Sequence, residues 1–220
     1  MRKSGGVLEL SASDLVGYLS CEHLSYLDRA LMDGILSKPN NWNQALELMR
    51  ERGRAHEDSF IEHLVSNGPK IVRIDGTDVD YDAVAQTSLA MRAGTVIIVQ
   101  GALSHNGWSG RPDVLRRVEQ TSSLGAWSYE VIDTKLARET KAGTILQLCL
   151  YSQLLGEMQG ILPDYMYVVV PWTEYEPEAF RFVDFAAYFR RVKQSFEQAL
   201  SKDRLGETYP DPRDHCEVCS

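Results

Sequence analysis

The chain has 220 residues and a formal net charge of −8; 44% of its residues are hydrophobic and 25% are charged. This size and composition are typical of one sizeable globular domain with a real core. No apolar run approaches 18 residues, and no apolar segment follows the two basic N-terminal residues, so we expect a cytoplasmic protein with neither a membrane span nor a signal peptide. The acidic charge argues against a nucleic-acid-binding surface over the whole molecule, but it fits a site for divalent cations.

The first half of the sequence indicates three helices and a short strand. Ser13 or Asp14 is a candidate N-cap for a helix that carries Cys21, with Leu15, Leu19 and Leu24 on its apolar face. An amphipathic pattern predicts a long helix over residues 42–66, and residues 70–74 are typical of a strand. A further helix over 80–94 is expected to end at Gly94.

The second half of the sequence indicates a sheet. Strands are predicted at 95–104 and 112–118, joined by a turn-rich segment, and again at 126–136. A helix over 139–158, an apolar strand over 164–171 and a helix over 182–200 follow. The order predicts an α/β fold in which helices flank a central mixed β-sheet.

Asp133 and Lys135 are two residues apart in YEVIDTKL, so their side chains point to the same face of a strand. Exposed Asp-x-Lys pairs are common, but two charges at the end of a mostly apolar strand are unusual unless a site uses them. Asp113 opens the preceding strand in GRPDVL, where proline and aspartate are also ordinary turn residues. If these strands pair, both carboxylates meet at one sheet end, and a divalent cation would relieve their repulsion.

Two helical motifs add candidates. His56 follows Gly53 in RGRAHE; a helical histidine is often only a packing or surface residue, but a mid-helix glycine indicates a close approach by something else. Gln147 and Tyr151 share one helix face at i and i+4. The N-terminal end of that helix, with Arg138 and Lys141, suits a phosphate group.

The four cysteines divide into two kinds. Cys149 lies in an apolar helical stretch and is interpreted as a core thiol. Cys21, Cys216 and Cys219 are more consistent with metal ligands or buried thiols than with disulfides in a reducing cytoplasm. The Cys-x-x-Cys pair indicates a metal site, which two thiolates rarely complete.

Together, these motifs resemble the RecB-like nucleases of the PD-(D/E)XK superfamily. The resemblance is closest to the iron–sulfur branch, which includes CRISPR-associated RecB-like exonucleases and nuclease domains fused to helicases. It runs from about residue 11 to residue 220, and the residues that match the family's motifs are His56, Asp113, Asp133, Lys135, Gln147 and Tyr151.

The resemblance implies a single nuclease domain with a restriction-endonuclease-like core over about 42–172. It implies a Mg²⁺- or Mn²⁺-dependent deoxyribonuclease of DNA repair, recombination or defence, most simply an exonuclease acting on single-stranded ends. Asp113, Asp133 and His56 would hold the metal, Lys135 would act on the attacking water, and Gln147 and Tyr151 would position the strand.

The resemblance also implies a four-iron, four-sulfur cluster that joins a cysteine helix at about 11–30 to a tail at about 183–220. Cys21, Cys216 and Cys219 match three of its ligands, and the family's last cysteine has no counterpart here. We therefore expect the sequence to be part of a longer protein, with a helicase as a candidate fused or associated partner.

Two alternatives stay open from the sequence. One is a nuclease-like domain without activity that binds DNA or serves as a scaffold for a helicase. The other concerns the metal: the three cysteines with His23 or His215 would form a Cys₃His zinc site.

Overall fold

The computed structural model describes residues 1–4, 7–37, 44–66, 68, 70–201 and 208–210 of the chain. It is an α/β fold built on a six-stranded mixed sheet, as the sequence predicts. The strand order is β10-β9-β8-β7-β4-β3, and the pairs β8–β9 and β3–β4 are parallel while the others are antiparallel. The strands of this sheet are β3 (Ile71–Arg73), β4 (Ile97–Val99), β7 (Val114–Val118), β8 (Ser128–Thr134), β9 (Tyr165–Val169) and β10 (Glu178–Arg181).

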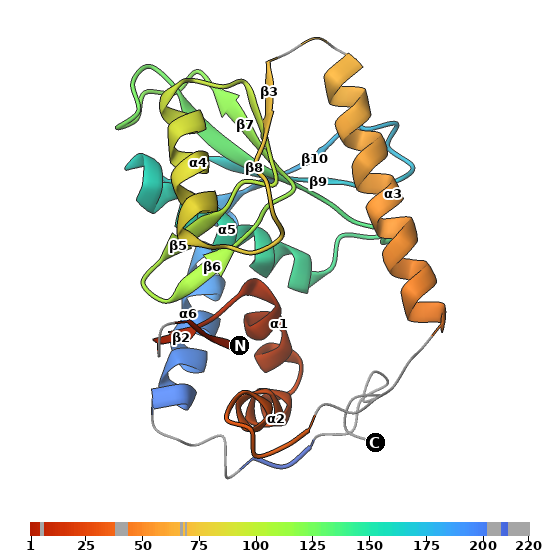
Figure 1. Ribbon diagram of the computed structural model, residues 1–220, viewed down its shortest axis with the longest axis vertical. Coiled ribbons are helices and arrows are strands. Elements are labelled where there is room, and N and C mark those ends of the chain that lie inside the picture. The colour runs from red at the N-terminus through yellow and green to blue at the C-terminus, as the bar shows by residue number, and fades with distance from the viewer. Residues whose placement is uncertain (5–6, 38–43, 67, 69, 202–207, 211–220) are drawn as a thin grey trace.

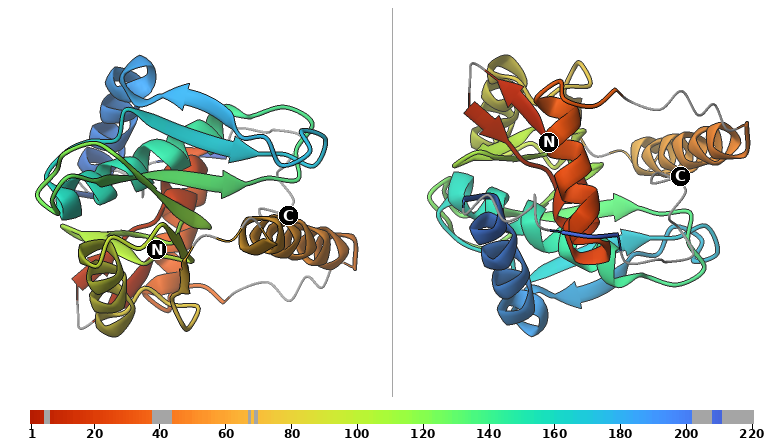
Figure 2. Two further views of the ribbon diagram at one scale, coloured as in Figure 1. Left: turned by 90° about the horizontal axis from the view of Figure 1, so that it is seen from above. Right: turned by 90° about the horizontal axis from the view of Figure 1, so that it is seen from below.

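Helices lie on both faces of the sheet (Figure 1). Alternate residues of β8 enter two different apolar clusters: Val131 packs with the buried side of α5, whereas Ile132 packs with Phe60 and Ile61 of α3. In Figure 2, α3 lies apart from α5 and α6. The helices are α1 (Ala12–Ser20), α2 (Glu22–Met32), α3 (Gln44–Ser66), α4 (Tyr81–Arg92), α5 (Ala142–Gln159) and α6 (Phe182–Ser201). None of the helices in these described ranges is long and apolar enough to cross a membrane.

The expected cysteine helix is two helices. Ser11, not Ser13 or Asp14, is the N-cap of α1; its backbone N–H and hydroxyl both donate to the Asp14 carboxylate at 2.8 Å. Cys21 has an extended backbone (φ −162°, ψ 113°), which ends α1 and begins α2. The apolar spacing of the leucines runs across this break, so periodicity alone did not reveal it.

The strand expected over 95–104 is also divided. It consists of β4 and β5 (Leu103–His105), because Gln100 between them adopts a left-handed backbone conformation with φ 55°. The segment expected as a turn contains β6 (Trp108–Gly110), which forms a hairpin with β5 through Asn106 and Gly107. Both turn residues have positive φ, as a two-residue Asn-Gly hairpin requires.

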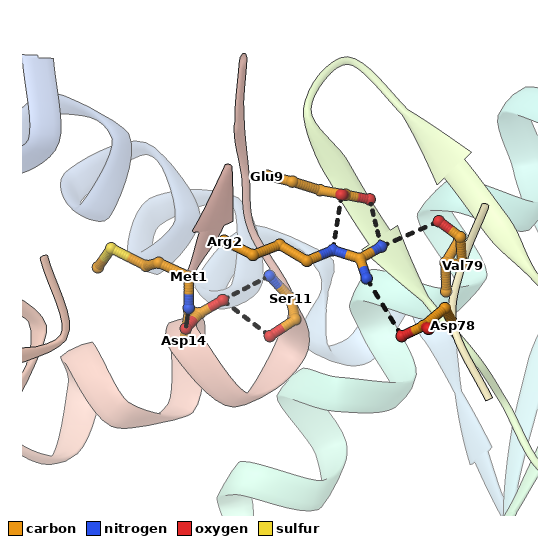
Figure 3. Close-up of polar contacts among 7 residues, drawn as sticks. All are labelled: Met1, Arg2, Glu9, Ser11, Asp14, Asp78 and Val79. Carbon is orange, nitrogen blue, oxygen red and sulfur yellow. Dashed lines mark hydrogen bonds and ion pairs between the residues drawn. The ribbon is translucent and has the colours of Figure 1, made fainter. Parts of the chain in front are cut away.

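The N-terminal hairpin, β1 (Arg2–Ser4) and β2 (Val7–Glu9), packs beside the β5–β6 hairpin. Figure 3 shows how it is held in place. The Arg2 guanidinium donates to the Glu9 carboxylate at 2.7 Å and to the Val79 carbonyl at 2.9 Å, just before α4. The Met1 amino group forms an ion pair with the buried Asp14. These contacts hold the N-terminal hairpin against α1 and the segment before α4.

Candidate functional site

Asp113 and Asp133 lie opposite each other at one end of the sheet. The antiparallel register pairs Val114 with Ile132, so the next position along places Asp113 against Asp133. The Asp133 carboxylate accepts a hydrogen bond from the backbone N–H of Asp113. The strand pattern of the sequence predicts this convergence, and the structure places the two residues side by side.

Both carboxylates are costly to ionise where they lie. Asp133 is 1% exposed, and burial, with the Asp113 charge as the second cause, raises its pKa to about 7. Burial also raises the pKa of Asp113, and the charge of Glu57 raises it further. Two hydrogen bonds to the Asp113 carboxylate oppose this, from the backbone N–H and the hydroxyl of Thr134, both at 2.7 Å.

Lys135 places a positive charge beside the two aspartates. Its ammonium group forms an ion pair with the Asp133 carboxylate, while its backbone N–H donates to the Val169 carbonyl at 2.9 Å. Burial alone would lower the pKa of Lys135, but the neighbouring Asp133, Asp113 and Glu57 raise it above its ordinary value. The lysine therefore stays charged beside the two aspartates.

Glu57 of α3 is a site residue that the sequence analysis missed. Burial raises its pKa, and the Asp133 charge acts in the same direction. The side-chain amide of Gln100 donates to the Glu57 carboxylate and lies 3.4 Å from an oxygen of Asp113. Glu57 is adjacent to His56 in a charged helix, and only the rotation of α3 about its axis decides which side chain faces the aspartates.

His56 comes to the same end of the sheet but contacts the backbone. Its Nε2 atom lies 3.2 Å from the Val169 carbonyl, the acceptor that Lys135 also uses. The structure thus brings His56 close to the lysine, and it places Glu57 in electrostatic contact with both aspartates.

Gln147 and Tyr151 of α5 border the aspartate pair from the face of the sheet opposite α3. The Gln147 amide donates to the Tyr151 hydroxyl at 2.9 Å, and burial with the Asp133 charge raises the pKa of Tyr151. A side chain at Gly110 would clash with the Tyr151 ring, so the glycine allows this close packing. Arg138 and Lys141 are exposed in the segment that joins Lys135 to α5.

The donor atoms in the site suit a hard divalent cation. Asp113, Asp133 and Glu57 supply carboxylate oxygens, the ligands that Mg²⁺ and Mn²⁺ prefer. Burial is the main cause of the raised pKa values of both aspartates, and a cation there would also offset the repulsion that Asp113 exerts on Asp133 and Glu57 exerts on Asp113. In the present arrangement their oxygens are engaged by Lys135, Thr134 and Gln100, and no group of three acidic, histidine or cysteine side chains in the described ranges is arranged around a metal position.

The second expected site is only partly described. Cys21 is half-buried between α1 and α2, and its N–H donates to the Gly17 carbonyl at 2.9 Å. Cys216, Cys219 and His215 lie outside the described residues. The nearest described segment before them does return to α2, because the Nδ1 atom of His23 lies 3.1 Å from the Thr208 carbonyl.

Cys149 is a core thiol, as expected. It is fully buried in α5, its sulfur lies 3.9 Å from that of Met166, and burial raises its pKa to about 12. An apolar, protonated thiol of this kind is neither a good nucleophile nor a good metal ligand.

No model of a known protein family matches this sequence, and a search of curated proteins finds no significant match.

Proposed function

We propose that this chain is a metal-dependent nuclease that hydrolyses phosphodiester bonds in DNA. The observation that carries the proposal is the buried Asp133, with the partly buried Asp113 opposite it and Lys135 beside it. Asp133 is 1% exposed and faces the partly buried Asp113; ionised carboxylates so placed oppose folding, so a protein that keeps them is expected to use them. The match to the motifs of PD-(D/E)XK nucleases of the RecB-like type is consistent with this chemistry.

Asp113 and Asp133 are the proposed ligands of Mg²⁺ or Mn²⁺, with His56 as the further ligand that the resemblance implies and Glu57 as a carboxylate in reach. When bound, the metal supplies Lewis-acid activation of the phosphate and lowers the pKa of a bound water. Thr134 fixes the orientation of the Asp113 carboxylate through two short hydrogen bonds.

Lys135 is the proposed electrophilic residue. A charged ammonium in a largely buried setting stabilises negative charge that develops on the phosphoryl oxygens, and it orients the attacking water. Its anchored backbone N–H keeps it beside Asp133. The protein thereby places one fixed positive charge next to the proposed metal ligands.

The proposed substrate is DNA with a single-stranded or free end, in repair, recombination or defence. Gln147 and Tyr151 are expected to position the strand from α5, and Arg138 and Lys141 to attract its phosphates. Arg138 and Lys141 bring positive charge to this segment, whereas the whole chain has a net charge of −8. A fused or associated helicase stays part of the proposal.

The cysteine site is proposed as the second cofactor site. Cys21, Cys216 and Cys219 would hold an iron–sulfur cluster, or with a nearby histidine a zinc ion. The contact between His23 and Thr208 supports a return of the C-terminal segment to Cys21. The visible absorption spectrum separates the two, because an iron–sulfur protein is brown and a zinc protein is colourless.

The test is digestion of end-labelled single- and double-stranded DNA with Mg²⁺, Mn²⁺ or a chelator. We expect cleavage only with metal and none by Asp133→Ala, whose circular dichroism spectrum should match that of the unchanged protein. Binding of DNA without cleavage under every metal condition would instead favour the scaffold function. Equal cleavage by both proteins would remove Asp133 from the active site.

A further inference from the structure

Gln100 has an unusual backbone conformation at the edge of the candidate site. It follows the last residue of β4 and adopts φ 55°, a left-handed conformation that is strained for residues other than glycine. Such strain is kept where the surrounding structure requires it. The next residue is Gly101, where a side chain would clash with Leu115, so the chain passes close to β7 at this point.

The conformation turns Gln100 toward two charged groups on different elements. Its backbone N–H donates to the Asp113 carbonyl at 2.8 Å, which extends the pairing of β4 and β7 by one step. Its side-chain amide donates to the Glu57 carboxylate and lies 3.4 Å from the Asp113 carboxylate. One neutral residue thus bridges α3 and the residue that precedes β7.

We propose that Gln100 is a positioning residue that holds the Glu57 carboxylate of α3 toward the carboxylate of Asp113, just before β7, so that both face the same cation. The inference rests on the proposed function, because it assigns Gln100 a part in the metal-binding geometry of that site. The amide is suited to this role: its two N–H groups can bridge two carboxylates that otherwise repel each other. Neither glutamate, which adds charge, nor an apolar residue can replace it.

The expected effect is on metal affinity. Side chains that orient metal ligands typically change affinity by about 10–100-fold when they are replaced. We therefore expect Gln100→Met to weaken Mn²⁺ binding by about tenfold or more, since Glu57 then loses the donor that directs it. Gln100→Gly should show the same loss of affinity even though it relieves the backbone strain.

Isothermal titration calorimetry with MnCl₂ and no DNA tests this, with Mn²⁺ electron paramagnetic resonance as a second readout. The matched control is Gln120→Met, because Gln120 makes a similar bond to a carboxylate, 3.2 Å to Asp164, away from the site. The control should bind Mn²⁺ like the unchanged protein. Thermal unfolding without metal checks that each variant is folded.

The outcomes separate this inference from the proposed function. Unchanged Mn²⁺ affinity in Gln100→Met overturns the role of the amide, and normal affinity in Gln100→Gly alone shows that only the turn matters, which overturns it as well. An unchanged protein that binds no Mn²⁺ at millimolar concentration also overturns it. If the protein binds Mn²⁺ through Gln100 but cuts no DNA, the positioning role stands and the nuclease proposal fails.

Discussion

Two buried acids three residues apart on β8 are treated in opposite ways by the fold. Glu130 is 4% exposed, and its carboxylate accepts from the Tyr165 N–H at 3.1 Å, the Tyr167 hydroxyl at 3.0 Å and Arg116 at 3.4 Å. Asp133 is 1% exposed and faces a second carboxylate. The first is compensated by fixed donors, as buried charges usually are. The second has Lys135 and the Asp113 N–H as partners but keeps a repulsive carboxylate beside it, and its pKa stays raised. This contrast distinguishes a structural acid from a candidate catalytic one.

The largest expected difference lies in the cations that accompany the two acids. Lys135→Met should lower the nuclease rate by about 10²–10³-fold, because the transition state loses a fixed positive charge. Arg116→Met should leave the rate within about twofold, since the Arg116 guanidinium contacts Glu130 and the ring of Tyr167 rather than the aspartate pair. Single-turnover cleavage of labelled DNA measures both. A large rate loss in Arg116→Met would break the comparison.

The pH dependence of stability should be the next largest effect. The folded-state pKa of Asp133 is about 7 against an ordinary value of 3.8, so the folded state holds this proton more tightly than the unfolded state. Its contribution to the free energy of unfolding is therefore greatest below about pH 4 and is lost as the pH rises through 7, by at most about 4 kcal/mol.

Urea unfolding in chelator at pH 5 and pH 8 tests this. Asp133→Asn should be more stable relative to the unchanged protein at pH 8 than at pH 5, because it removes the ionising group. Glu130→Gln serves as the control. An equal stability difference between Asp133→Asn and the unchanged protein at both pH values would show that ionising Asp133 does not destabilise the fold.

Metal should remove the penalty at Asp133. At a concentration about 100-fold above its dissociation constant, Mn²⁺ should raise the free energy of unfolding by about 2.7 kcal/mol. The shift in Tm should be much smaller in Asp133→Asn, which has lost a charged ligand. An equal shift in both proteins would place the cation elsewhere.

The smallest expected effect is on the structural acid. Glu130→Gln should destabilise the fold by about 1–3 kcal/mol, because Arg116 and the Tyr167 hydroxyl lose a charged acceptor inside the sheet. Denaturant unfolding at pH 7 measures this, and nuclease activity should be retained once the protein is folded. Glu130→Gln with full stability and no activity would reverse the assignment of the two acids.

The sequence predicted the part of the site that follows strand periodicity. Asp133 and Lys135 share a strand face, and the pairing of β7 with β8 brings Asp113 to them, so regular spacing was sufficient. Glu57 was missed because adjacent charged residues in α3 have no sequence signal that sets the rotation of the helix. Gln100 was missed because its role arises from a left-handed backbone at a point where a continuous strand was expected.

The fold was predicted in outline and missed where the chain is irregular. The long helices and the mixed sheet follow from apolar periodicity. Strand β10, only four residues long, carries no strong pattern and was not expected. The Asn106–Gly107 hairpin was interpreted as a simple turn, although this dipeptide between two strand-like segments is a known hairpin signal. Local turn chemistry would have corrected that assignment.

The position of α3 has a consequence for the way the site can open. The helix meets the sheet through a small apolar cluster around Phe60 and Ile61, whereas α5 lies in the main core. Toward its start, Leu48 and Met49 are exposed. Local unfolding starts from weakly packed elements, so amide hydrogens of α3 should exchange faster than those of α5. Because Glu57 belongs to α3, a partial unfolding of this one helix would move Glu57 away from the aspartates while β7, β8 and α5 stay folded.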